Sequence, residues 1–158
     1  MFATGMRVSE LCSLKESQFD FHDYIIKIYG KGSKERLIYI CNANVQRLID
    51  EYRITTESIE KSYSFINRLH KRLSEQSVRY MIDNYAQNAH ISQHITPHMF
   101  RHTFATLLLE EDVDIRYIQL MLGHSSITTT QIYTHMSINK QKTILAKKHP
   151  RNKLDIGV

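Results

Sequence analysis

The dipeptide Thr96-Pro97 constrains the fold of this chain most strongly, because it fixes where one long helix begins. A threonine side chain can accept a hydrogen bond from the first turn of a helix, and proline suits the first helical position. The apolar residues that follow at helical spacing are Phe100, Phe104, Leu107 and Leu108. The sequence therefore predicts a helix that starts here and packs one apolar face against a core.

Five further segments have the residue spacing of helices. They cover residues 7–14, 42–52, 74–89, 114–122 and 138–148. Asn42 or Asn44 can cap the second of them, Ser74 can cap the third, and Gly123 ends the fourth as a C′ glycine does. A short additional helix is expected over residues 125–133.

Three short segments are rich in β-branched and aromatic residues, which favours strands. They cover residues 19–21, 24–29 and 36–40. Because Gly30-Lys31-Gly32-Ser33 separates the last two, we expect a small antiparallel sheet. Residues 55–63 are expected to form a surface loop, and residues 150–158 a loose tail. The predicted fold class is therefore mainly α with a small antiparallel β-sheet (α+β).

Length and composition indicate an ordinary globular protein, but they do not identify its function. The 158 residues suit one domain, and the apolar (42%) and charged (23%) fractions are ordinary for a globular protein. No apolar run approaches the ~18 residues of a membrane span, and we expect no cleavable signal. Cys12 and Cys41 form no CxxC pair, so we expect a cytoplasmic protein without a membrane partner. A net charge of +5 is compatible with a nucleic-acid partner.

His98 and Arg101 are the first candidates for chemistry, because the i, i+3 spacing puts them on one face of the helix start. We expect the apolar stripe of Phe100, Phe104 and Leu107 to point elsewhere. The first turn of a helix also attracts anions through its unpaired N–H groups. A phosphate would therefore suit this position, although the same spacing is also common on solvated helices.

Four other residues are candidates by type and position: His124 after Gly123, Tyr133, Arg7, and Lys31 in the glycine-rich turn. Each has a more common structural explanation when taken alone. A histidine often follows a C-cap glycine, most tyrosines pack at the edge of a core, and single arginines or lysines are usually solvated.

Metal and nucleotide sites are not expected. The pairs His90/His94 and His98/His102 have a spacing that could hold zinc, but neither contains H-E-x-x-H, and the guanidinium of Arg101 disfavours a cation. Residues 30–33 do not match the Walker spacing, so we expect no nucleotide.

Taken in order, five segments resemble one family. They are A-T-G-M-R-V-S-E-L (3–11), G-K-G-S-K-E-R (30–36), T-P-H-M-F-R-H (96–102), L-G-H (122–124) and I-Y-T-H (132–135). They resemble the catalytic domain of the tyrosine recombinases, the phage-integrase family, and most closely its bacterial Xer-like branch. The resemblance implies the fold of a DNA breaking-rejoining enzyme. It also implies a catalytic domain over residues 1–149, lacking its first helix and the family's N-terminal DNA-binding domain, and a C-terminal tail over residues 150–158.

The resemblance further implies a metal-independent and cofactor-independent reaction in site-specific recombination or integration. Tyr133 would attack a DNA phosphodiester and form a 3′-phosphotyrosyl link, while Arg7 and Arg101 clamp the phosphate. Lys31 would protonate the leaving oxygen, His98 would serve as general base, and His124 would donate a hydrogen bond. The candidate DNA contacts outside this set are Lys34, Arg36 and Arg79.

The expected partner is double-stranded DNA, with no small-molecule substrate. The resemblance implies a homotetramer in which residues 138–148 dock on a neighbour through Ile138, Leu145 and Ala146. It also implies a mobile genetic element, a phage or a transposon. The alternative function is a truncated, catalytically silent remnant that keeps weak DNA or partner binding. A type IB topoisomerase would share the chemistry, but the form of the segment from L-G-H to Tyr133 disfavours it.

Overall fold

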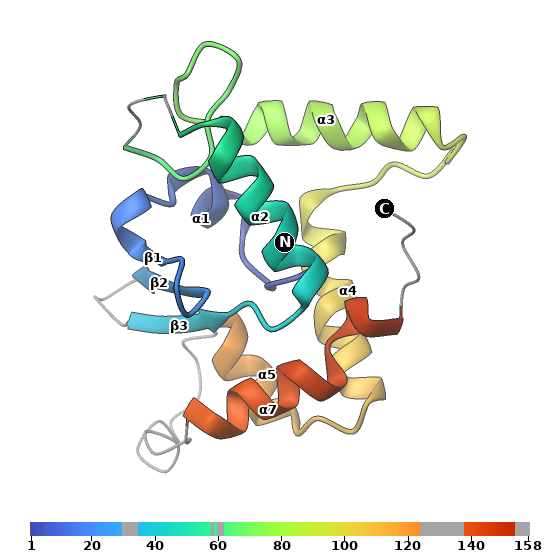
Figure 1. The fold of residues 1–158 in the computed structure, drawn as a ribbon. Helices are drawn as coiled ribbons and strands as arrows, with labels where there is room; N and C mark the ends of the chain where they lie inside the picture. The colour runs from blue at the N-terminus through green and yellow to red at the C-terminus, as the bar shows by residue number, and fades with distance from the viewer. Residues whose placement is uncertain (30–34, 58, 60–61, 124–137, 154–158) are drawn as a thin grey trace.

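The structure, a computed structural model, describes residues 1–29, 35–57, 59, 62–123 and 138–153. It is mostly helical, with one three-stranded antiparallel sheet, which confirms the predicted fold class (Figure 1). The elements are α1 (Val8–Ser13), β1 (Phe19–Asp20), β2 (Ile25–Tyr29), β3 (Glu35–Tyr39), α2 (Ala43–Thr55), α3 (Glu75–Asn88), α4 (Pro97–Glu110), α5 (Ile115–Leu122) and α7 (Ile138–Lys148), with 3-10 turns at Glu16–Gln18 and Pro150–Lys153.

The sheet has the order β1-β2-β3, and one of its faces is buried. Along β2, Ile26 and Ile28 are buried, whereas Lys27 is exposed, as expected for a strand covered on one face. Ile26 pairs with Ile38, and Ile28 pairs with Arg36 on β3. Side chains of directly paired residues lie on the same face of a sheet, so this register turns Arg36 towards the buried side.

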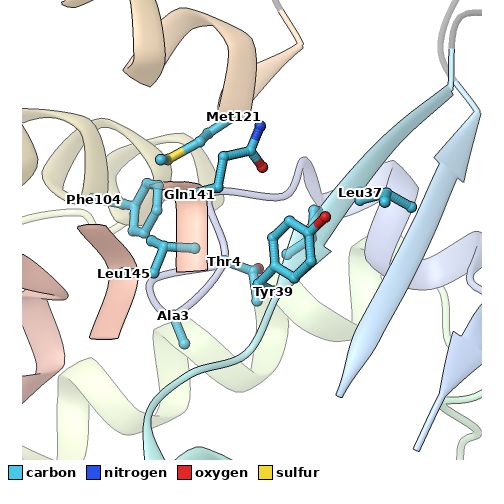
Figure 2. Close-up of a pocket in the computed structure, with 9 residues that line it drawn as sticks. Ala3, Thr4, Leu37, Tyr39, Phe104, Met121, Gln141 and Leu145 are labelled. Carbon is cyan, nitrogen blue, oxygen red and sulfur yellow. The ribbon is translucent and has the colours of Figure 1, made fainter. Parts of the chain in front are cut away.

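A hydrophobic core joins the sheet to the C-terminal helices. Phe104 and Leu108 of α4, Met121 of α5 and Leu145 of α7 pack there with Tyr39 of β3. Figure 2 shows Phe104, Met121 and Leu145 around a pocket at this junction, with Tyr39 on its other side. In this structure Leu145 therefore packs within its own chain, whereas the sequence resemblance implied contact with a neighbour.

Helix α3 lies at one edge of the molecule in Figure 1 and is only partly covered. Ser74 caps it, as predicted, by accepting a hydrogen bond from the Ser77 N–H at 3.0 Å. Val78 and Ala86 are its buried residues. Tyr85, which follows the same apolar spacing, is exposed, because helical spacing cannot say how much of a helix its neighbours cover.

Two irregular segments are more ordered than the sequence suggested. Helix α2 continues through Thr55, and Thr56 is buried with its hydroxyl donating to the Tyr52 carbonyl at 2.9 Å. The expected loose tail from residue 150 is wrong for residues 150–153. They form a 3-10 turn in which the Asn152 amide donates to the Ala146 carbonyl. The helix expected over residues 125–133 lies outside the described residues. Within the described part of the chain, no helix has both the length and the apolar character needed to cross a membrane.

Candidate active site

Gly5 allows the N-terminal segment to approach α4 and α5 closely. Its φ is +63°, and a Cβ at this position would lie 2.7 Å from a Leu122 side-chain carbon and 2.8 Å from a Phe104 ring carbon. Only glycine tolerates both the backbone conformation and this distance. As a result, the segment that leads into Arg7, the N-cap residue of α1, packs against α4 and the end of α5.

Arg101 lies at the centre of the site and is only 7% exposed. Its Nη1 donates to the carbonyl of Gly5, and its Nη2 donates to the carbonyl of Leu122 at 2.7 Å. Leu122 is the last residue of α5, and the carbonyls of the last helical turn receive no hydrogen bond from an N–H of the same helix. The guanidinium of Arg101 supplies this missing donor. These hydrogen bonds make the burial of Arg101 tolerable.

The burial of Arg101 corrects one expectation from the sequence. Arg101 shares the buried face of α4 with Phe104 and Leu108, which follow at i+3 and i+7. The expected arrangement, with the apolar stripe pointing away from Arg101, is therefore wrong. Spacing alone could not reveal the two distant carbonyls that allow an arginine to occupy a core-facing position.

Three guanidinium groups and one carboxylate form what we call the arginine cluster: Arg7, Arg36, Arg101 and Glu10. Burial, followed by the nearby positive charge of Arg7 and then that of Arg36, lowers the pKa of Arg101 to about 10, while the negative charge of Glu10 opposes this shift. Arg101 therefore remains protonated near neutral pH. The net charge of the cluster is positive, which suits a phosphate ligand.

Arg7 is the most accessible arginine of this cluster, with 45% of its side chain exposed. Its Nη1 lies 3.0 Å from Glu10 Oε1, and its backbone N–H donates to Glu10 Oε2 at 2.8 Å. The contact is the i, i+3 pair of a capping box at the start of α1. Glu10 was not among the residues predicted from the sequence, although its i, i+3 spacing from Arg7 is a signal that could have identified it.

As a candidate DNA contact, Arg36 was expected to be an exposed side chain of the hairpin. In the structure it is largely buried. Only 10% of its side chain is exposed, and its two terminal nitrogens lie 2.9 and 2.7 Å from the two carboxylate oxygens of Glu10. It also packs over Gly123, where a Cβ would lie 2.9 Å from Arg36 Nη1. The sheet register explains this position, because Arg36 pairs with the buried Ile28.

His98 and Arg79 are both on helices and both exposed. His98 lies in the first turn of α4, one turn before Arg101, where a helix presents backbone N–H groups to an anion. Arg79 lies on α3, and its Nη2 is 2.9 Å from Glu75 Oε2. Among the residues that the structure describes, no three His, Cys, Asp or Glu side chains form a group that could hold a metal ion.

Four predicted site residues fall outside the described residues: Lys31, Lys34, His124 and Tyr133. Along the chain, Lys31 and Lys34 come between β2 and β3, and His124 directly follows Gly123. Their assignments remain predictions from the sequence. Among the predicted site residues that the structure describes, Arg7 and Arg101 lie in one cluster. Arg36 belongs to the same cluster.

Comparison with known sequences gives consistent matches over nearly all of the chain. The sequence model of the phage integrase family matches residues 1–140. A tyrosine recombinase of Agathobacter rectalis is 57% identical over 153 residues, which cover 96% of this chain and 50% of that protein. Tyrosine recombinase XerC of Bacillus pumilus is 40% identical over 158 residues, covering 96% of this chain and 52% of that protein. The chain thus spans about half the length of the curated relatives it matches.

Solved structures show the same arrangement of elements. The crystal structure of XerA recombinase has a TM-score of 0.73 and 34% sequence identity, and the match covers 95% of this chain and 56% of that one. The XerH site-specific recombinase bound to difH substrate, in a pre-cleavage complex, has a TM-score of 0.70 and 29% identity. That match covers 92% of this chain and 44% of the other.

Proposed function

Because the chain belongs to the phage integrase family, we propose that it cleaves and rejoins DNA strands in site-specific recombination, through a 3′-phosphotyrosyl intermediate. The observation that carries this proposal is the arginine cluster. Gly5 and Arg101 hold the start of α1 against α4 and α5, and Arg7 lies close enough to Arg101 for its positive charge to lower the pKa of Arg101. Two neighbouring guanidinium groups are a suitable receptor for the non-bridging oxygens of a phosphodiester.

In this mechanism the arginines act on the transition state. Attack on the phosphorus concentrates negative charge on the equatorial oxygens of a pentacoordinate species. Arg7 and Arg101 stabilise that charge, and because Arg101 is already fixed by two carbonyls, it needs no reorganisation during the reaction. His98 is exposed in the first turn of α4, one turn before Arg101, and this supports a role for it at the same phosphate.

The remaining roles follow the family resemblance. The phenol oxygen of Tyr133 attacks the phosphorus, its proton passes to His98, and the bond to the 5′-oxygen breaks. Lys31 protonates that leaving oxygen, and His124 donates a hydrogen bond to the phosphate. A phenol with an ordinary pKa of about 10 needs such a base or strongly positive surroundings to react near neutral pH. Attack of a 5′-hydroxyl on the phosphotyrosyl link then rejoins a strand, with no need for ATP or metal.

We further propose that the substrate is double-stranded DNA, held also by Lys34 and Arg79, and that the reaction proceeds in a homotetramer in the cytoplasm. A mobile element such as a phage or transposon is the proposed setting. Exchange of residues 138–148 between subunits would require Leu145 to leave the core of its own chain. Residues 1–149 would form the catalytic domain, with residues 150–158 as the tail.

A nicked suicide duplex tests this function directly, because loss of the short cleaved fragment traps the covalent intermediate. We expect a protein–DNA adduct that survives denaturant and forms equally well in EDTA. Tyr133→Phe should abolish the adduct, whereas Tyr85→Phe, which changes an exposed tyrosine of α3 in the same way, should not.

The same experiment separates the alternative function. A silent remnant would bind DNA without forming an adduct. No adduct at high protein concentration on the natural recombination site would support the remnant. An adduct that persists in Tyr133→Phe would show that the nucleophile is misassigned.

A further inference from the structure

Arg36 occupies a position in the site that its sequence context does not suggest. It is the second residue of β3, in a segment with several basic residues, and an exposed DNA contact was the expectation. The pairing of Arg36 with Ile28 turns it inwards instead, and the absence of a side chain at Gly123 leaves room for its guanidinium. Arg36 therefore reaches the arginine cluster from the sheet, whereas Arg7 reaches it from α1.

The carboxylate of Glu10 links these two arginines. Oε1 accepts from Arg7 Nη1 at 3.0 Å and from Arg36 Nη1 at 2.9 Å. Oε2 accepts from the Arg7 backbone N–H at 2.8 Å and from Arg36 Nη2 at 2.7 Å. A carboxylate accepts about four hydrogen bonds, so Glu10 is fully occupied. Arg36 holds it with a complete fork, while Arg7 uses one terminal nitrogen of its side chain.

This division of contacts has an electrostatic consequence. Without Arg36, the negative charge of Glu10 would be offset mainly by Arg7, which would draw the Arg7 guanidinium onto the carboxylate. With Arg36 in place, the remaining donors of Arg7 can face an incoming phosphate. A bidentate pair also fixes the orientation of the carboxylate, and through it the side chain of Arg7.

Stability alone does not explain this pair. Buried ion pairs often contribute little to folding, because desolvation offsets their attraction. The buried Nε of Arg36 has no hydrogen-bond partner among the described residues, which adds a further cost. An apolar pair would fill this position with fewer unpaired groups.

We infer that Arg36 is a positioning residue for the proposed DNA cleavage: acting through Glu10, it orients Arg7 and offsets the Glu10 charge, without touching DNA itself. The inference rests on the proposed function, because Arg7 is the residue that meets the phosphate. This positioning role replaces the direct DNA contact that was expected of Arg36 from the sequence.

Single-turnover cleavage of the suicide duplex distinguishes these roles. Arg36→Gln should lower the cleavage rate at saturating DNA by about tenfold or more, with little change in the half-saturating DNA concentration, because Arg7 is misplaced. Arg36→Lys should restore part of the rate, since an ammonium keeps the charge but not the fork. Arg47→Gln is the matched control: it removes an exposed arginine that pairs with Glu51, and the rate should not change.

Glu10→Gln supplies the decisive comparison, because it removes a negative charge beside the phosphate. If Arg36 and Glu10 act by positioning, this variant also cleaves more slowly despite its more positive site. A faster rate would overturn the inference. So would a raised half-saturating DNA concentration for Arg36→Gln at an unchanged saturating rate, which is the behaviour of a phosphate contact. Rates that merely follow the folded fraction of each variant would indicate a structural role only.

A second measurement does not depend on cleavage. Inorganic phosphate is titrated into the chain while the guanidinium Nε–Hε signals of its arginines are followed by NMR. The Arg7 signal should shift in the wild type, the Arg36 signal should not, and the Arg7 shift should be reduced in Arg36→Gln. If Arg7 does not respond, or Arg36 responds as strongly, the inference fails, whether or not the chain forms a DNA adduct.

Discussion

Arg101 connects three parts of the chain that are far apart in sequence. Its hydrogen bonds reach Gly5, 96 residues away, and Leu122, 21 residues away. Arg7, His98 and Arg101 could be selected from the sequence as candidates for the site, because they stand at fixed places in short motifs. The burial of Arg101 and Arg36 could not, since it depends on distant carbonyls, a carboxylate and the register of two strands.

Arg101 should matter more for the reaction than its exposure suggests. Arg101→Ala should raise the barrier to adduct formation by about 2–4 kcal/mol, as expected for loss of one preorganised transition-state donor. The rate of adduct formation on the suicide duplex measures this. Arg101→Lys should recover little, because one ammonium cannot replace a fork that bonds both carbonyls. Full activity in Arg101→Ala would exclude it from the phosphate site.

Gly5 should be intolerant of any side chain. Gly5→Ala should lower the free energy of unfolding by about 2 kcal/mol or more, because a Cβ would meet the packed side chains of Leu122 and Phe104. Gly123→Ala is the comparison, since its φ of +68° is similar but the nearest atoms belong to the Arg36 side chain. Urea denaturation should show the smaller loss for Gly123→Ala; equal losses would mean that backbone strain alone explains both.

At the scale of elements, local sequence signals predicted where helices begin better than they predicted how helices pack together. Thr96-Pro97, Ser74 and Asn42 mark helix starts in both the sequence and the structure. The side chains of Ser74 and Asn42 accept hydrogen bonds from the first turns of their helices, whereas the Thr96 side chain makes no such bond. The placement of α7 against β3 and α4 was not predicted. That packing depends on a core shared by distant segments, which apolar spacing in one helix cannot specify.

The docking of the segment that follows α7 should depend on pH through His149. His149 is buried, and its Nε2 lies 2.8 Å from the Ala3 carbonyl oxygen. Burial lowers the pKa of His149 below its ordinary 6.5, with Arg151 lowering it further against the opposing hydrogen bond to Ala3. The unfolded chain therefore takes up a proton first, and stability should fall as the pH drops below 6.5.

The measurement is the free energy of unfolding at about pH 7.5 and about pH 5.5, a range in which histidines titrate. His149→Gln keeps a donor for the Ala3 carbonyl but cannot titrate, so its stability should change less between the two conditions than that of the wild type. An identical change in both proteins would assign the pH dependence to other groups.

For the whole molecule, the family could be predicted from short motifs along the chain, because several motifs in a fixed order are far more specific than any one of them. How far other elements cover the surface of each helix could not be predicted in this way. Tyr80, Met81 and Tyr85 of α3 are large and hydrophobic, yet they are exposed. Exposure of this kind is a property of the surroundings of a helix rather than of its own sequence.

DNA binding by this chain should be weak and strongly dependent on salt. Its net charge is only +5, and phosphate contacts release counterions when they form. The logarithm of the affinity should fall linearly with the logarithm of the salt concentration. Arg79→Gln should reduce that slope by about one contact, whereas Arg47→Gln should not. Tight binding to one defined sequence that is insensitive to salt would contradict this prediction.

Mass spectrometry of the trapped protein–DNA adduct tests the proposed chemistry most directly, because it identifies the residue that carries the DNA. After digestion of protein and DNA, the phosphotyrosyl nucleotide should be found on the peptide that contains Tyr133, attached through a 3′-phosphate. A nucleotide on another residue, an attachment through a 5′-phosphate, or a wild-type chain that binds the duplex but yields no modified peptide would contradict it.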